Sequence, residues 1–182
     1  MCGNGGRCII HFAQMLKIVE NKTLFIAIDG VHKGYYAQEI ISIQMKDVES
    51  IKLLGEDLVI DTGSPHYVQQ RQDLDNIDVD LEGRGVRRSE EFLKSGINVN
   101  FVKVADNFQV RTYERGVEKE TLSCGTGVVA SVIAMHYINN INQNTVKVDT
   151  KGGYLEVSFE ENKGVYRNIW LSGKVSMIYS GK

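Results

Sequence analysis

Residues 2–16, CGNGGRCIIHFAQML, and residues 124–138, CGTGVVASVIAMHYI, form a weak internal repeat within a chain of 182 residues. In each copy a cysteine stands directly before Gly-x-Gly, and an apolar pattern follows it. The first copy has apolar residues at helical spacing, which predicts a helix over residues 3–19. The second copy is apolar nearly all round, which predicts a helix over residues 125–137 that is buried on every side. Two helices that begin at the same kind of turn indicate two similar halves that face each other.

The remainder of the chain consists of short strand-like runs separated by turns. Strands are expected at TLFIAI (23–28), QEIISIQMK (38–46), SIKLL (50–54), EDLVIDTGSPHYVQQ (56–70), INVNFVKVA (97–105) and NFQVRTYER (107–115). Residues 29–34, DGVHKG, predict a turn, and the charged stretch over residues 85–93 predicts a short helix. Residues 145–162 and 165–181 predict two hairpin-like units. Together these patterns predict an α+β protein of mainly short antiparallel strands around two main helices.

Composition excludes several classes of protein. The formal net charge is -2, which leaves no basic field for a nucleic-acid backbone, and no apolar run is long enough to cross a bilayer. Neither a nucleic acid nor a membrane is therefore an expected partner. The chain has three cysteines, which cannot all pair with one another, so we expect no disulfide framework and a reducing, cytoplasmic compartment. Cysteines and histidines do not recur at metal-ligand spacing, so we expect no metal.

A cysteine at the start of a helix is suited to acid–base chemistry. The first turn of a helix has backbone N–H groups without partners and a partial positive charge, so it binds a carboxylate and stabilises a thiolate. If the two turns face each other, Cys2 and Cys124 lie on opposite faces of a bound Cα atom. One sulfur removes the α-proton and the other supplies a proton, which inverts the stereocentre without a cofactor. The alternative is a small buried apolar residue, which is our interpretation of Cys8.

Four motifs of this sequence resemble those of the diaminopimelate epimerase family. They are MCGNGGRC (1–8), TGSPHYV (62–68), INVNFV (97–102) and YERGVEKETLSCGTG (113–127), and the likeness continues to the closing IWLSGKVSMIYSG. The resemblance implies two pseudo-symmetric halves, each a curled, mainly antiparallel sheet around a central helix. It also implies a cofactor-independent epimerase that converts LL-2,6-diaminopimelate to the meso form, in lysine and peptidoglycan precursor biosynthesis. The implied partner is a small amino-acid substrate.

The resemblance further implies which residues perform the reaction. Cys2 and Cys124 are then the acid–base pair, and Glu114 and His66 lie near the reacting amino group and the thiols. A glutamate suits the ammonium group of the substrate. Without the resemblance, Glu114 followed by an arginine is equally typical of a weak surface ion pair, and a histidine after proline is typical of a turn.

A second set of residues is implied to bind the substrate. The α-carboxylate would contact Gly3, Asn4, Gly125 and Thr126, and the distal carboxylate and amino group would contact Arg115, Asn98 and Ser64. The planar fork of an arginine suits a carboxylate. No cofactor-binding residue and no metal ligand is implied.

The sequence also departs from the family pattern. Ser64 stands where the family usually has asparagine, and its shorter side chain reaches less far. The stretch between Glu114 and Cys124 is one residue longer than usual. The segment that usually precedes the first motif is absent, so we expect an incomplete first half, formed by residues 1–46 and 168–182, and a second half over residues 47–167. The incomplete half would have exposed sheet edges, which favour a homodimer.

Two other functions remain open on sequence grounds. The proline racemase and hydroxyproline epimerase group uses the same two-thiol logic, but it usually has histidine where this chain has Asn4. Asn4 and the YERG segment therefore favour diaminopimelate. The second alternative is an inactive fragment of the fold that acts as a binding or assembly module.

Overall fold

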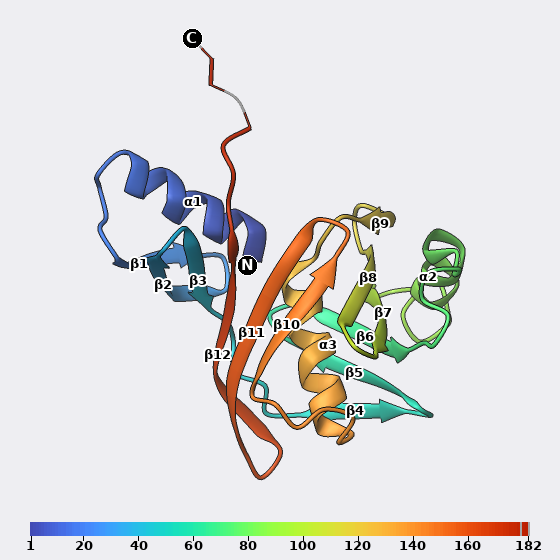
Figure 1. Cartoon of the computed structure of the whole chain (residues 1–182). Coiled ribbons are helices and arrows are strands. Elements are labelled where there is room, and N and C mark those ends of the chain that lie inside the picture. Colours follow the sequence, from blue (N-terminus) through green and yellow to red (C-terminus); the bar gives the residue numbers. More distant parts are fainter. Residues whose placement is uncertain (179, 182) are drawn as a thin grey trace.

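The computed structural model describes residues 1–178 and 180–181. Within that part, the fold comprises one twelve-stranded sheet and three helices (Figure 1). The strand order is β1-β2-β3-β12-β11-β10-β8-β7-β6-β5-β4, with β9 paired to β8. The helices are α1 (Gly3–Met15), α2 (Val79–Arg87) and α3 (Gly125–Tyr137). The strands are β1 (Lys22–Ala27), β2 (Gly30–Ala37), β3 (Ile40–Gln44), β4 (Ile51–Leu54), β5 (Asp57–Asp61), β6 (Pro65–Gln70), β7 (Asn98–Val104), β8 (Phe108–Glu114), β9 (Lys119–Thr121), β10 (Thr145–Thr150), β11 (Gly153–Asn162) and β12 (Val165–Lys174).

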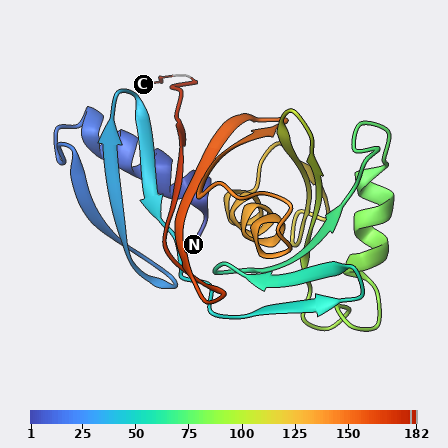
Figure 2. The same ribbon diagram turned by 60° about the horizontal axis from the view of Figure 1, so that its bottom comes forward.

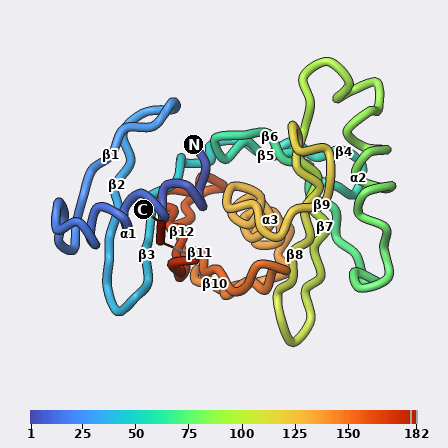
Figure 3. Tube along the Cα trace, turned by 90° about the horizontal axis from the view of Figure 1, so that it is seen from above, coloured from blue at the N-terminus to red at the C-terminus, as the bar shows by residue number. Residues whose placement is uncertain are grey.

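Helix α3 lies in the centre of the curled sheet. Figures 2 and 3 show the strands from β4 to β12 surrounding it, and every residue from Gly125 to Met135 is buried. Burying a Val or Ile side chain stabilises by about 1.5–3 kcal/mol, which exceeds the few tenths of a kcal/mol by which such residues disfavour a helix. Packing therefore holds this helix, and the predicted burial on every side is confirmed. The expected α+β fold of a curled sheet around a central helix is confirmed with it.

Helix α1 packs with one face against β2 and β3. Ile10 is buried on that face, and a Cβ atom on Gly34 of β2 would lie only 2.3 Å from Ile10 Cδ1, so the strand passes this close to the helix only at a glycine. Ile9, Phe12 and Leu16 are all more than half exposed on the other face. The helix ends at Met15, before the predicted end at residue 19.

Strand β12 joins strands β1, β2 and β3 to the remaining strands of the sheet. It pairs with β11 along its length and with β3 through its last residues, so the prediction of a hairpin-like unit over 165–181 is wrong. Gly173 lies within this strand, and a Cβ atom there would lie 2.5 Å from Leu155 Cδ2. Tyr179 and Lys182 lie outside the described residues. The division into residues 1–46 with 168–182 and residues 47–167 stays a prediction.

The predicted turn at residues 29–34 is also wrong. Strand β2 occupies Gly30–Ala37, and the chain reverses at Ile28 and Asp29. His32 and Gly34 are the buried positions of this strand. The period-two pattern is hidden in the sequence because one of its inward positions has no side chain.

The predicted helix at residues 85–93 lies earlier in the chain. Helix α2 begins after Asp78, whose carboxylate accepts a hydrogen bond from the backbone N–H of Leu81 at 3.0 Å. Asp80 and Glu82 in its first turn favour this helix start. The capping residue, and not the run of charges, therefore sets the position of the helix.

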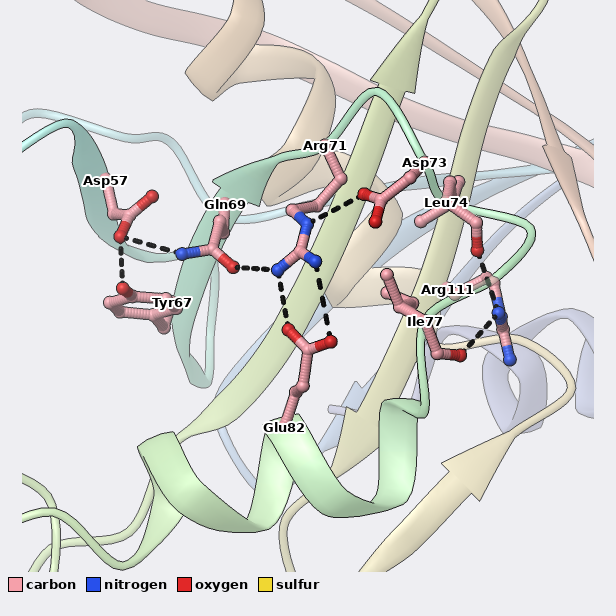
Figure 4. A network of polar contacts seen from close by, with 9 residues as sticks. All are labelled: Asp57, Tyr67, Gln69, Arg71, Asp73, Leu74, Ile77, Glu82 and Arg111. Atoms are coloured by element: carbon pink, nitrogen blue, oxygen red, sulfur yellow. Dashed lines mark hydrogen bonds and ion pairs between the residues drawn. The ribbon is translucent and has the colours of Figure 1, made fainter.

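Two arginines hold the segment around α2 against the sheet (Figure 4). Arg71 donates to Glu82 of α2 through both terminal nitrogens, at 2.5 and 3.4 Å. Arg111 of β8 donates to the backbone carbonyl oxygens of Leu74 and Ile77, at 2.8 and 3.2 Å. These bonds fix the path of the connection between β6 and α2.

The two glycines of α2 provide a matched test of how closely this helix packs. A Cβ atom on Gly83 would lie 2.4 Å from Tyr113 Cβ, whereas one on Gly85 would meet nothing within 4 Å. Alanine raises helix propensity by up to about 1 kcal/mol at either site, but the overpacking at Gly83 costs about 1–3 kcal/mol. Gly83→Ala should therefore lower the free energy of unfolding in urea, and Gly85→Ala should leave it unchanged or raise it. Equal effects of the two substitutions would contradict the close contact with Tyr113.

Candidate active site

The first residues of α1 and α3 are in contact through their backbones. A Cβ atom on Gly3 would lie 3.4 Å from Gly125 Cα, and one on Gly125 would lie 3.2 Å from Gly3 Cα. Each of these atoms would also lie within 3 Å of Leu171 Cδ2 on β12. Only glycine permits this approach, and Figure 3 shows the start of α1 beside α3. The structure thus brings together the two Cys-Gly-x-Gly turns, which are 122 positions apart in the repeat (124 minus 2).

Polar bonds connect the same two turns. Asn4 donates through Nδ2 to the carbonyl oxygen of Ser123 at 3.1 Å. The Oδ1 atom of Asn4 accepts a bond from Arg7 Nη2 at 2.8 Å. Arg7 is 5% exposed, and burial lowers the pKa of its guanidinium. Asn4, expected to bind the substrate carboxylate, therefore also bridges the two turns.

The two cysteines occupy unlike environments. Cys2 is exposed, and its Sγ accepts a hydrogen bond from the backbone N–H of Gly5 at 3.4 Å. Cys124 is 9% exposed, and its Sγ lies 3.5 Å from Thr126 Oγ1. Burial raises the pKa of the Cys124 thiol, and the negative charge of Glu114 raises that pKa further. Cys124 thus resists ionisation, and Glu114 lies close enough for its charge to act on the sulfur.

His66 reaches Cys124 through Thr126. The ring is fully buried, and its Nε2 lies 2.9 Å from Thr126 Oγ1, while its Nδ1 lies 3.0 Å from Asn100 Nδ2. Burial lowers the pKa of His66 to about 3, and the positive charge of Arg115 acts in the same direction. His66 is therefore a neutral imidazole across the physiological range of pH.

Ser64, Asn98 and Arg115 form a second polar cluster. The parallel pairing of β6 and β7 aligns His66 with Asn98, and Asn98 Nδ2 donates to Ser64 Oγ at 2.9 Å. Asn98 Oδ1 accepts from the backbone N–H of Arg115 at 2.9 Å. The guanidinium of Arg115 donates to the carbonyl oxygen of Ser95 at 3.1 Å and to Ser64 Oγ at 3.5 Å. Asn98 therefore holds the side chain of Ser64 and the backbone of Arg115.

The structure adds residues that sequence reasoning did not single out. Arg7 stands inside the first motif, and Asn100 stands in INVNFV two positions after Asn98, so both had a signal in the sequence. Leu171, which lies against both helix starts, and Thr112, which donates to Asn100 Oδ1 at 3.0 Å, had none. The roles expected for the predicted site residues stay predictions.

Residues 1–178 and 180–181 are those that the structure describes. No group of three or more histidine, cysteine or acidic side chains among them is placed to hold a metal ion. None of the helices formed by these residues has the length and apolar character needed to span a membrane.

Solved structures define the class of fold. A phenazine biosynthesis protein of the PhzF family from Enterococcus faecalis matches with a TM-score of 0.70 at 16% identity, over 98% of this chain and 71% of that protein. A hydroxyproline epimerase from Agrobacterium vitis matches with a TM-score of 0.67 at 12% identity, over 96% of this chain and 64% of that protein. The chain therefore has a fold shared with amino-acid epimerases.

Sequence comparison identifies the family within that class. The family model for diaminopimelate epimerase matches residues 58–178. The diaminopimelate epimerase of Flavobacterium psychrophilum is 46% identical over 98% of this chain and 71% of that protein, and that of Aquifex aeolicus is 36% identical over 100% of this chain and 69% of that protein. The chain belongs to the diaminopimelate epimerase family and is an amino-acid epimerase.

The buried neutral His66 predicts a specific dependence of stability on pH. The pKa of His66 falls from 6.5 to about 3 on folding, so between these values the unfolded chain binds a proton that the folded chain does not. This contribution to stability is complete above pH 6.5 and is lost as the pH falls, by up to about 1.4 kcal/mol per pH unit. Urea unfolding between pH 7.5 and 5 should show this decline, and His66→Gln should have the shallower slope. Equal slopes would show that His66 is protonated in the folded protein.

Proposed function

We propose that this protein converts LL-2,6-diaminopimelate to the meso form, with Cys2 and Cys124 as the acid–base pair and no cofactor. The observation that carries the proposal is the backbone contact of Gly3 with Gly125, because each glycine follows one of the two cysteines. The relatives named diaminopimelate epimerase support the choice of substrate. We assign the reaction to lysine and peptidoglycan precursor biosynthesis in the cytoplasm. A homodimer remains part of this proposal.

In the proposed mechanism the substrate Cα atom lies between the two sulfur atoms. The α-carboxylate binds at the helix starts, where Gly3, Asn4, Gly125 and Thr126 offer backbone N–H groups. Cys124 begins as the thiol, since burial raises the pKa of this group, and Cys2 begins as the thiolate. Cys2 takes the α-proton of the LL isomer while Cys124 gives its proton to the opposite face. The two cysteines end with exchanged protonation states, and the reverse reaction starts from that form.

The same helix starts stabilise the charge that develops during the reaction. Removal of the α-proton moves an electron pair toward the carboxylate, whose oxygens become more negative. Fixed N–H dipoles directed at such oxygens lower the barrier without reorganising. We assign Glu114, whose charge acts on Cys124, to the α-ammonium group of the substrate. That pairing would also relieve the repulsion between Glu114 and a Cys124 thiolate.

The second polar cluster is proposed to select the distal end of the substrate. Asn98 holds Ser64 and the backbone of Arg115 in one arrangement. The guanidinium of Arg115 then binds the distal carboxylate through parallel N–H groups, and the hydroxyl group of Ser64 adds a shorter contact than asparagine would. An amino acid without a distal carboxylate lacks these bonds.

The acid–base assignment predicts which cysteine substitutions abolish the reaction. Cys2→Ala and Cys124→Ala should each reduce epimerisation at least about a hundredfold, the lower range for loss of a proton-transfer group. Cys8→Ala should retain activity, because Cys8 lies further along α1 and is exposed, so the expectation of a buried Cys8 is wrong. Loss of the α-proton signal in deuterated water, followed by NMR, measures each variant. Equal activity of all three variants would refute the mechanism, and exchange with proline but not diaminopimelate would refute the substrate.

The distal-site assignment predicts a separate effect at Arg115. Arg115→Lys keeps the charge but loses the planar fork, so kcat/KM for diaminopimelate should fall by about 10–100-fold, mostly through KM. Arg167→Lys on the exposed side of β12 is the matched control and should have no effect. An unchanged KM in Arg115→Lys would remove this residue from the substrate site.

A further inference from the structure

We propose that Asn100, His66 and Thr126 form an ordered hydrogen-bond relay that directs the hydroxyl proton of Thr126 at Cys124 Sγ. This inference rests on the proposed function, because the relay affects the reaction only if Cys124 acts as an acid and a base. Asn100 and His66 are then positioning residues, and Thr126 is the group that contacts the reacting sulfur.

The orientation of the Asn100 amide is fixed by its other partners. Its Nδ2 lies 3.1 Å from the carbonyl oxygen of Tyr67, which can only accept, so the amide nitrogen must face that oxygen. Its Oδ1 accepts from Thr112 Oγ1 at 3.0 Å. Strand pairing aligns Asn100 with Thr112 of β8 and with Val68 of β6, so both neighbouring strands hold this side chain. The amide therefore cannot flip without losing two buried bonds.

The amide of Asn100 determines which nitrogen of His66 carries the proton. The second N–H of Nδ2 points to His66 Nδ1 at 3.0 Å, so Nδ1 must accept and cannot carry a hydrogen. Because burial keeps this ring neutral, its single proton is on Nε2. That nitrogen lies 2.9 Å from Thr126 Oγ1 and donates to it.

Because Thr126 accepts this hydrogen bond from His66, its own hydroxyl hydrogen is available to donate to another acceptor. Oγ1 already accepts from the ring, and the hydroxyl hydrogen is directed toward Cys124 Sγ, 3.5 Å away. The carbonyl oxygen of Thr126 accepts from Thr62 Oγ1 at 2.9 Å, which fixes the turn that carries the hydroxyl group. Thr126 thus offers a hydrogen bond that favours the thiolate form of Cys124.

Close packing of α3 against β6 and β7 holds the residues of the relay within hydrogen-bond distance of one another. A Cβ atom on Gly127 would lie 2.3 Å from Asn100 Oδ1 and 3.3 Å from His66 Cε1. The second glycine of the Cys124 turn therefore lets α3 approach β6 and β7 closely enough for Thr126 to reach the ring. This gives a reason for a glycine at that position that is separate from binding a carboxylate.

The relay opposes the other influences on Cys124. Burial disfavours its thiolate, and so do the charges of Glu114 from β8 and Cys2 from α1, whereas the Thr126 hydroxyl and the backbone N–H of Gly127 favour it. The charged groups that act on His66 are Asp61 and Arg115, whose effects on the ring are opposite in sign. Cys124 must become a thiolate in one direction of the proposed reaction, and the relay makes that form accessible.

The first test determines the tautomer in the unmodified protein. The 15N NMR spectrum of protein labelled at histidine should show His66 with a protonated Nε2 and an unprotonated Nδ1 at neutral pH, assigned by loss of the signals in His66→Gln. A proton on Nδ1, or on both nitrogens, would overturn the relay. This result does not depend on whether any cysteine is catalytic.

The second test measures the ionisation of Cys124 directly. In a Cys2→Ala, Cys8→Ala background Cys124 is the remaining thiol, and its thiolate absorbs in the ultraviolet. Thr126→Val removes the hydroxyl group at nearly constant volume and should raise the midpoint of this titration by about one to two pH units. Thr126→Ser keeps the hydroxyl group and should restore the midpoint. Ser131→Ala is the control, because it removes another buried hydroxyl group of α3, which donates to the carbonyl oxygen of Gly127 at 2.7 Å and is not part of the relay, and it should leave the midpoint in place.

The outcomes separate the relay from the proposed function. Unchanged midpoints in Thr126→Val would overturn the relay, even if both cysteines prove essential for epimerisation. A raised midpoint together with full activity of Cys124→Ala would sustain the relay and refute the proposed function. If both proposals hold, the pH profile of kcat/KM in Thr126→Val, with Cys2 and Cys8 intact, should shift in the same direction as the titration.

Discussion

The backbone contact between Gly3 and Gly125 is the constraint on which the candidate site depends. A methyl group at either position would meet the other helix or Leu171 of β12 at 2.8 to 3.4 Å. Leu171 belongs to the strand that pairs with both β3 and β11, so the sheet itself carries the two helix starts to one place. The glycines of the motif therefore permit the close approach of the two helices, in addition to their proposed role in ligand binding. Any side chain at these positions would separate the two cysteines.

The similar motifs produce two dissimilar cysteines. Cys2 caps a helix that is covered on one face, and its sulfur is exposed, whereas Cys124 caps a helix that the sheet surrounds. A two-base inversion requires one thiol and one thiolate at the start of each turnover. Burial raises the pKa of Cys124 and so favours the thiol form of this cysteine. The internal repeat in the sequence thus gives equivalent positions, and the unequal covering of the two helices gives them different chemistry.

The elements that could be located from the sequence are those that a pattern within one continuous segment indicates. The buried helix α3 is visible in an unbroken apolar run, and the pairing of the two turns is visible in the repeat. Strand β2 was missed because the inward position at Gly34 has no side chain, and α2 was displaced because its start depends on the cap at Asp78. The contacts of Thr112 and Leu171 depend on strand register between distant segments, which no local pattern encodes. The chemistry of the site could be anticipated from the motifs, but the contacts of its supporting residues could not.

Strand β7 shows how a single register serves both ends of the proposed substrate site. Side chains two positions apart point to the same side of a strand, so Asn98 and Asn100 lie on the same face of the sheet. Asn98 orients Ser64 and Arg115, while Asn100 orients His66, which acts on the turn of Cys124 through Thr126. A slip of one residue in this pairing would turn both asparagines away at once. The spacing between the proposed distal-binding cluster and the turn of Cys124 is therefore set by strand β7.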